Sequence, residues 1–307
     1  MKRSNLKGSL ILCLAALLWG LAFAVQASAA AVPAFTFNGI RSYVGAIFLL
    51  IVWKLFLNKD KTPFFPKQKS DRKKYYKAAL VCGICLSISM NLQQFGIKLY
   101  PKDVAIEARS GFITALYVIL VPIISVFLKK KINVFVGLGG IVAMVGIYVL
   151  CLSSGLGGIY LGDILTFCCA ISFAIHILSI DAFVGVTGGV KLSIMQFFVA
   201  ATVSMILSFI FDTVSIAAVV SIIPQILYMG IFSSGIAYTL QIIGQKYAEP
   251  AVASITMSLE SVFAALGGVV ISGRFLKSYE IIGCTLVFAA IIVAQIPEMI
   301  NKNKSTD

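Results

Sequence analysis

Charged residues and histidine are scarce in this sequence. Only 12% of the 307 residues are Asp, Glu, Lys or Arg, about half the share of an ordinary soluble domain, and His176 is the single histidine. Hydrophobic residues make up 60% of the chain, and the mean hydropathy is +1.00. This composition excludes a soluble globular enzyme, a disordered protein and a small disulfide-stapled domain. It leaves a protein that crosses a membrane many times.

Nucleotide-binding and hydrolase motifs are also absent. The sequence has no G-x-x-x-x-G-K-[ST] loop, which argues against an ATP-driven pump, and no H-E-x-x-H or G-x-S-x-G, which argues against an intramembrane hydrolase. Cys82 and Cys85 have C-x-x-C spacing, which fits either a redox or metal pair or two membrane-buried thiols. A zinc site needs two further ligands, so we favour the thiols. We expect no enzyme activity, no cofactor and no metal.

Apolar runs of about 20 residues recur along the whole chain. A helix needs about 20 residues to cross a hydrocarbon core of roughly 30 Å, and it satisfies its own backbone hydrogen bonds there. The first run follows Lys2, Arg3 and Lys7 and ends near Ala27-Ser28-Ala29, as a cleaved signal peptide also does, but its length favours an uncleaved span. We expect ten transmembrane helices, at 8–27, 34–57, 76–97, 108–128, 132–152, 161–181, 191–211, 222–244, 249–272 and 278–297.

Lys and Arg fall mainly in alternate loops. Nineteen of the 25 lie on the side of the N-terminus, nine of them between Lys54 and Lys77, and five lie on the other side, with Arg41 left inside a span. The positive-inside rule then places both termini, including the tail 298–307, in the cytoplasm. The sequence predicts a multi-pass protein of the cytoplasmic cell membrane. Because the net charge of +13 lies in short loops, we expect no nucleic-acid partner.

Two halves of the chain share sequence patterns. Residues 92–98 and 240–246, which are 148 positions apart, both read L-Q-x-x-G-x-K, and 115–117 pair in the same way with 258–260. A repeat of five helices, an odd number, places the two halves in opposite orientations. We predict an all-α membrane protein of two inverted five-helix repeats, 8–152 and 161–297, with a binding site near the midplane between them.

Several short motifs occur in a fixed order along the chain. They are Leu18-Trp19-Gly20, then Phe-Ile-Thr-Ala-Leu-Tyr at 112–117 with Val121-Pro122, and Ser-Leu-Glu-Ser-Val-Phe-Ala at 258–264. With these motifs the whole chain resembles the drug/metabolite transporter superfamily, in its ten-helix EamA-type branch with two EamA domains. The Gly-Glu-Arg that often follows helices four and nine in that family is missing, and Pro101–Ser110 is longer than usual. The resemblance implies secondary transport of small metabolites such as amino acids, sugars or nucleotides.

Two ionisable residues lie inside predicted spans. Glu260 follows Glu249 by 11 residues, or roughly 16 Å along a helix, which is about the centre of the hydrocarbon core. Such a residue marks a substrate or proton pathway, or else forms a structural hydrogen bond to a neighbouring helix. Arg41 lies seven residues into the second helix, where it either attracts a carboxylate or phosphate of the substrate or extends to the headgroups.

Aromatic and amide side chains complete the candidate site. For each aromatic residue, ordinary helix packing is the competing interpretation, whereas amides that face lipid are unfavourable and indicate a polar cavity. We place His176 near the cytoplasmic end of the sixth helix as a structural residue, and we expect Pro122 to kink the fourth. The candidate substrate-binding residues are Trp19, Arg41, Tyr43, Asn91, Gln93, Gln94, Tyr117, Tyr238, Gln241 and Glu260.

The leading hypothesis is a secondary-active transporter, favoured as an exporter by the resemblance, that moves amino acids or related polar and amphipathic compounds by alternating access. The alternative is a non-transporting membrane scaffold or a lipid-handling protein. A cavity lined by Gln93, Gln241 and Glu260 favours transport, whereas tight pairing of these side chains in a dry core favours the scaffold. The expected partners are a small-molecule substrate and membrane lipids, with proton coupling and a monomeric state as working assumptions.

Overall fold

The protein is a bundle of helices. A computed structural model describes residues 5–29, 31–58, 63–101, 106–130, 132–150, 159–272 and 278–303, and these contain no strand. The helices are α1 (Asn5–Ser28), α2 (Ala34–Val52), η1 (Trp53–Leu57), α3 (Lys69–Lys98), α4 (Ile106–Thr114), α5 (Tyr117–Phe127), α6 (Val134–Leu150), α7 (Leu161–Thr187), α8 (Gly189–Phe211), α9 (Ile216–Ser221), α10 (Ile223–Tyr228), η3 (Met229–Ala237), α11 (Tyr238–Gln245), α12 (Pro250–Met257), α13 (Leu259–Ser272) and α14 (Ser278–Asn303). The π-helical segments η1 and η3 continue α2 and α10.

The predicted all-α membrane fold with about ten spans is confirmed. The described residues contain seven helical stretches of at least 18 residues that are apolar enough to cross a membrane. Three shorter apolar stretches, Val134–Val149, Pro250–Ala264 and Ile281–Pro297, account for the remaining expected spans. Residues 102–105 of the lengthened Pro101–Ser110 segment and residues 304–307 of the predicted tail lie outside the described part.

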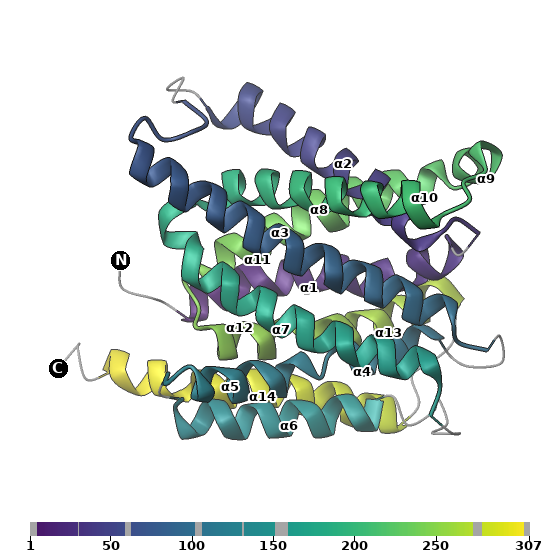
Figure 1. Ribbon diagram of the computed structural model, residues 1–307. Coiled ribbons are helices and arrows are strands. Elements are labelled where there is room, and N and C mark those ends of the chain that lie inside the picture. The colour runs from purple at the N-terminus through teal and green to yellow at the C-terminus, as the bar shows by residue number, and fades with distance from the viewer. Residues whose placement is uncertain are drawn as a thin grey trace.

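Helix α1 lies between the upper and lower helices in Figure 1 and exposes one face, with Leu10 and Leu14, whereas α6 and α14 form a pair at the edge of the bundle. α1 packs against α11, α12, α13 and η3. A Cβ atom on Gly139 of α6 would lie 2.8 Å from the carbonyl oxygen of Ala290 in α14, so glycine permits this close approach. α1 begins and α14 ends on the same side of the bundle, as an even number of crossings requires (Figure 1).

Two of the expected spans are interrupted at their centres. In the fourth span, α4 ends at Thr114 and α5 begins at Tyr117. In the ninth span, α12 ends at Met257 and α13 begins at Leu259, so Ser258 alone separates them. In both turns backbone amides bond three residues back: Val118 N–H donates to Ala115 O at 2.9 Å, and Ser261 N–H to Ser258 O at 3.1 Å. These are the tighter bonds of a 3₁₀ turn. The interruptions therefore fall at the two positions that the sequence patterns pair.

The interruption in the fourth span is not at Pro122, where we expected the kink. Pro122 lies inside α5 and removes only the hydrogen bond to the carbonyl four residues earlier, that of Val118. In the ninth span, the hydroxyl of Ser258 donates a hydrogen bond to the backbone oxygen of Ile255 in the preceding turn at 2.7 Å. Such side-chain bonds to the preceding turn bend helices.

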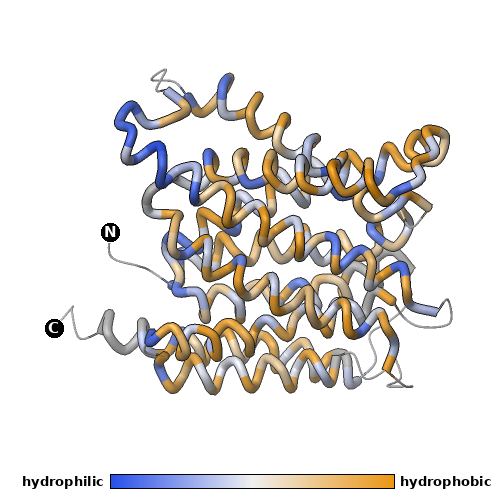
Figure 2. Tube along the Cα trace, in the orientation of Figure 1, coloured by the Kyte–Doolittle hydropathy of each residue, from blue (hydrophilic) through white to orange (hydrophobic). Residues whose placement is uncertain are grey.

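The outer surface of the bundle is apolar along the length of the helices (Figure 2). Large hydrophobic side chains such as Leu10, Phe209 and Ile292 are exposed on it, which suits contact with lipid rather than water. Hydrophilic residues gather at the start of α3, where Lys69, Arg72, Lys73, Lys74 and Lys77 are exposed (Figure 2). The exterior thus has the apolar band and basic edge of a membrane protein.

Candidate functional site

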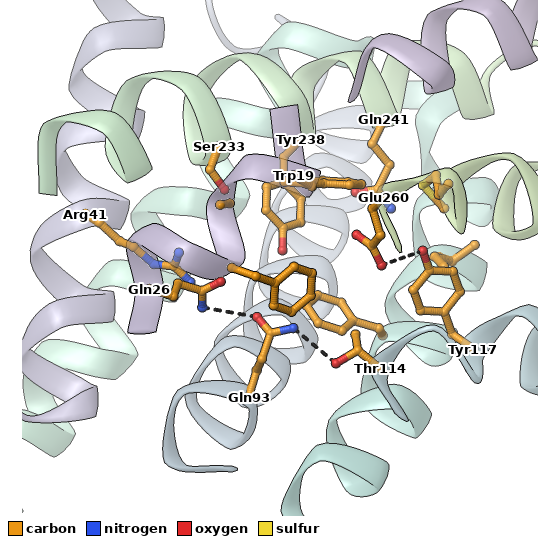
Figure 3. A pocket seen from close by; sticks show the side chains of 15 residues that line it. Trp19, Gln26, Arg41, Gln93, Thr114, Tyr117, Ser233, Tyr238, Gln241 and Glu260 are labelled. Atoms are coloured by element: carbon orange, nitrogen blue, oxygen red, sulfur yellow. Dashed lines mark hydrogen bonds between the residues drawn. The ribbon is translucent and has the colours of Figure 1, made fainter. Parts of the chain in front are cut away.

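A pocket lies among the inner helices of the bundle. Its empty volume, including the part that is open to solvent, is about 510 Å³. The lining residues come from α1, α2, α3, α4, α5, α7, η3, α11, α12 and α13, so both halves of the chain contribute (Figure 3). They are Trp19, Ala22, Phe23, Gln26, Arg41, Gln93, Thr114, Tyr117, Phe173, Ile177, Ser233, Tyr238, Gln241, Met257 and Glu260.

The pocket contains one basic and one acidic side chain, at opposite ends (Figure 3). Arg41 is 2% exposed and Glu260 is 5% exposed. The guanidinium carbon of Arg41 lies 5.3 Å from the ring centroid of Phe37, and its Nε has no hydrogen-bond partner among the described residues. Glu260 Oε1 accepts a hydrogen bond from the Tyr117 hydroxyl at 3.0 Å. Within the described ranges, oppositely charged side chains come closer than 4 Å at Lys130 and Asp181, which do not line the pocket. Neither Arg41 nor Glu260 therefore has an ion-pair partner in this part of the chain.

The Tyr117–Glu260 hydrogen bond joins the two interrupted spans. Tyr117 is the first residue of α5 and Glu260 the second residue of α13. A carboxylate in the first turn of a helix is stabilised by the partial positive charge of that helix end. The turn at Ser258 therefore gives Glu260 a favourable electrostatic position that an unbroken helix would not supply.

A chain of amide and hydroxyl groups forms another wall of the pocket. Gln26 Nε2 donates to Gln93 Oε1 at 3.2 Å and to Gln94 Oε1 at 3.2 Å. Gln93 Nε2 in turn donates to Thr114 Oγ1 at 3.3 Å. These bonds satisfy buried amides that would be costly without partners, and they link α1, α3 and α4.

Aromatic rings separate the charged ends of the pocket. Trp19 and Tyr238 meet edge to face with centroids 4.8 Å apart, and Tyr238 also contacts Phe197 at 5.3 Å. This T-shaped geometry is the one that aromatic pairs favour. These rings form an aromatic surface in the pocket between Arg41 and Glu260 (Figure 3).

Sequence comparison assigns the chain to a family. The profile of the EamA-like transporter family matches residues 6–152 and again 160–295. The chain belongs to this family. It is 28% identical over 299 residues to an uncharacterized transporter of Archaeoglobus fulgidus, covering 95% of this chain and 87% of that one. A solved crystal structure with 19% identity has the same fold, with a TM-score of 0.75 over 95% of this chain and 98% of that one. The protein is therefore a multi-pass membrane transporter and not an enzyme.

Most of the sequence-predicted residues of this EamA-like transporter line its pocket, and three do not. The Tyr43 hydroxyl pairs with Thr202 Oγ1 at 3.0 Å, and Asn91 bonds to Ser204 Oγ at 2.9 Å, so both join α2 or α3 to α8. Gln94 does not line the pocket, but its Oε1 accepts a hydrogen bond from Nε2 of Gln26, which does. Successive helical residues point about 100° apart, so 91, 93 and 94 cannot all face one cavity. The pocket residues are Trp19, Arg41, Gln93, Tyr117, Tyr238, Gln241 and Glu260.

Sequence reasoning missed several pocket residues of the transporter. The polar ones are Gln26, Thr114 and Ser233. Gln26 lies at the end of a predicted span, where polar residues are common and do not indicate a site. Ser233 lies in η3, and the sequence does not reveal its π-helical turn. Thr114 belongs to the Phe-Ile-Thr-Ala-Leu-Tyr motif, and its hydroxyl in an apolar run is the signal that could have indicated it.

The structure corrects the position of His176. We placed it near the cytoplasmic end of the sixth span, but α7 extends to Thr187, so His176 lies near the middle of the helix and is fully buried. Its Nε2 is 3.1 Å from Gln196 Oε1 of α8, and its ring lies 6.2 Å from that of Tyr238. His176 thus packs against Tyr238 but does not itself line the pocket. Among the described residues no three His, Cys, Asp or Glu side chains are placed to hold a metal.

Proposed function

We propose that this transporter exports small metabolites, amino acids or related polar and amphipathic compounds, across the cytoplasmic membrane by alternating access. The observation that carries the proposal is the pocket between the two halves of the chain, with two buried charges and an amide wall. Polar and ionisable groups are expensive at membrane depth, and they are retained where they meet water, an ion or a substrate. The absence of an ATP-binding motif favours secondary transport.

The pairing of the two halves supports alternating access. Residues 8–152 contribute Trp19, Arg41, Gln93 and Tyr117 to the pocket, and residues 161–297 contribute Tyr238, Gln241 and Glu260. The interrupted spans fall at positions that the repeat pattern pairs. In transporters with inverted repeats, discontinuous helices at the interface form the site, and one repeat rocks against the other.

The scaffold alternative is less well supported. Gln93, Gln241 and Glu260 all line the pocket rather than pairing with one another in a dry core. Gln241 Oε1 has no hydrogen-bond partner among the described residues. An unpaired buried acceptor costs folding free energy, so a ligand or water in the pocket that donates a hydrogen bond to Gln241 Oε1 would offset this cost.

Orientation, coupling and assembly are part of the proposal. The 19-to-5 distribution of basic residues supports a cytoplasmic location for both termini. Glu260 supplies a titratable group for proton coupling, and a monomer suffices because one chain completes the pocket. Export rather than import rests on the family resemblance.

Counterflow in proteoliposomes tests the proposal. Vesicles loaded with one compound are diluted into the labelled form of that compound, for a panel of amino acids, nucleosides, sugars and organic cations. We expect at least one class to accumulate transiently, above protein-free vesicles, and to lose accumulation in the Arg41→Gln variant. If no compound of the panel accumulates while the protein is monodisperse, the proposed function is wrong. Efflux from preloaded cells then tests direction, since an exporter lowers retained substrate.

A further inference from the structure

Three atoms of residues that line the pocket are buried without a hydrogen-bond partner among the described residues, and one of them, the donor Trp19 Nε1, belongs to the aromatic rings between the charged ends. At one end, Arg41 Nε is buried without a partner among the described residues; at the other, Gln241 Oε1 is buried without one, next to the Glu260 carboxylate (Figure 3). The first group donates hydrogen bonds and carries positive charge, whereas the second and third accept hydrogen bonds, and the carboxylate carries negative charge. A ligand that satisfies both ends must therefore be anionic at one end and cationic at the other.

The buried charges need such a ligand. A guanidinium keeps its charge inside proteins, and removing it from water without a counter-ion costs several kcal/mol on the general scale of buried ions. Neither Arg41 nor Glu260 has an ion-pair partner within the described ranges. They also do not neutralise each other directly, since they lie apart across the aromatic rings (Figure 3). A bound zwitterion would pair with both.

The geometry of each end selects a chemical group. A guanidinium presents a planar fork of donors that matches a carboxylate. The oxygens of Glu260 and Gln241 suit the three N–H donors of an ammonium group, and the aromatic side chains of Trp19 and Tyr238 line the same pocket. The apolar side chains that line the pocket include Phe23, Phe173, Ile177 and Met257.

We propose, on the basis of the proposed transport function, that the substrate is a small zwitterion whose carboxylate binds Arg41 and whose ammonium group binds Glu260 and Gln241. Its uncharged part is apolar and packs on the aromatic and aliphatic lining. The pocket thereby discriminates against compounds with one charge, because each of them leaves one buried protein charge unpaired.

Competition in counterflow, with labelled leucine and labelled 6-aminohexanoate used as tracers in separate experiments, tests this assignment. The competitors are leucine, leucinamide, which keeps only the positive charge, and N-acetylleucine, which keeps only the negative charge. 6-Aminohexanoate, with its own amide and N-acetyl forms, tests a larger separation of the two charges. We expect the wild type to prefer one of the two zwitterions over its singly charged forms by roughly 10- to 100-fold, as for a buried charge left without its partner.

Variants assign each end of the ligand. The variants are compared by competition for binding of the labelled zwitterion to purified protein, which does not require transport. Arg41→Gln removes the preference for the zwitterion over the amide and keeps the preference over the N-acetyl form, and Glu260→Gln does the reverse. Thr202→Val is the matched control, because it removes the hydroxyl that pairs with Tyr43 outside the pocket and leaves all preferences unchanged. Size-exclusion profiles verify folding, and the wild-type preference decides the outcome even if one variant misfolds.

The outcomes separate this inference from the proposed function. If singly charged forms compete as well as both zwitterions, or if neither zwitterion competes or is transported, the zwitterion assignment is wrong. If another class of the broad panel still accumulates, the transport function stands. If no compound of either panel accumulates, both proposals fail.

Discussion

Replacing Gly20 with alanine would place a methyl group between α1 and α13. A Cβ atom there would lie 2.6 Å from Phe263 Cβ, 2.8 Å from the backbone nitrogen of Ala264 and 2.9 Å from the carbonyl carbon of Phe263. Two of these atoms belong to the backbone, so no side-chain rotation relieves the contact and the helices must separate. Overpacking of this kind costs about 1–3 kcal/mol.

The matched control is Gly137→Ala in α6, where an added Cβ meets nothing within 4 Å. Both substitutions gain about 0.5–1 kcal/mol from the higher helix propensity of alanine, so this gain cancels in the comparison. Gly20→Ala should therefore be less stable than Gly137→Ala by about 1–3 kcal/mol, the overpacking cost alone.

Cysteine unmasking in detergent measures this difference. Cys82 in α3 and Cys169 in α7 are fully buried, so a maleimide dye reacts with them as the bundle opens on heating. We expect a lower midpoint for Gly20→Ala than for the wild type, and a midpoint for Gly137→Ala at or above that of the wild type. Equal midpoints for the two variants would show that α1 and α13 do not pack as closely as described.

Three further predictions concern other parts of the protein. Glu260→Gln should express and remain monodisperse but lose substrate accumulation or its pH dependence, whereas wild-type transport with an unchanged pH profile would make Glu260 a structural residue. A single cysteine at Lys67 should resist an impermeant reagent in intact cells, and labelling from outside would reverse the orientation. Asp212 caps α2 by accepting bonds from Thr36 N at 2.8 Å and Thr36 Oγ1 at 2.7 Å, so Asp212→Ala should cost about 1–2 kcal/mol in the unmasking assay, and an unchanged midpoint would argue against this cap.

The transmembrane spans could be predicted because the hydrocarbon core imposes a length of about 20 apolar residues on each. Their ends could not, since α3 starts at Lys69 and α7 extends to Thr187, beyond the apolar runs. A helix can continue into water beyond its apolar run, and hydropathy does not predict where such a helix ends. The displacement of His176 from the end to the middle of its helix follows from this limit.

The candidate site was predictable in part for a similar reason. Arg41 and Glu260 stood out because an ionisable residue inside an apolar run is costly unless it meets a partner, water or a ligand. Gln93 and Gln94 could not be separated, because the choice between them depends on the rotation of α3 about its own axis. Ser233 depended on the π-helical turn of η3, which changes the helical register and has no signature in composition.

None of the 15 residues around the pocket comes from α6 or α14. Gly139 and Gly146 hold this pair together through contacts with Ala290 and Leu286, independently of the substrate site. The pair can therefore serve as a fixed reference for spectroscopy. Probes on its exposed residues Leu138 and Ile281 should keep one mutual distance throughout a transport cycle. Distances measured from them to the rest of the bundle would then report the motion of the transporting helices alone.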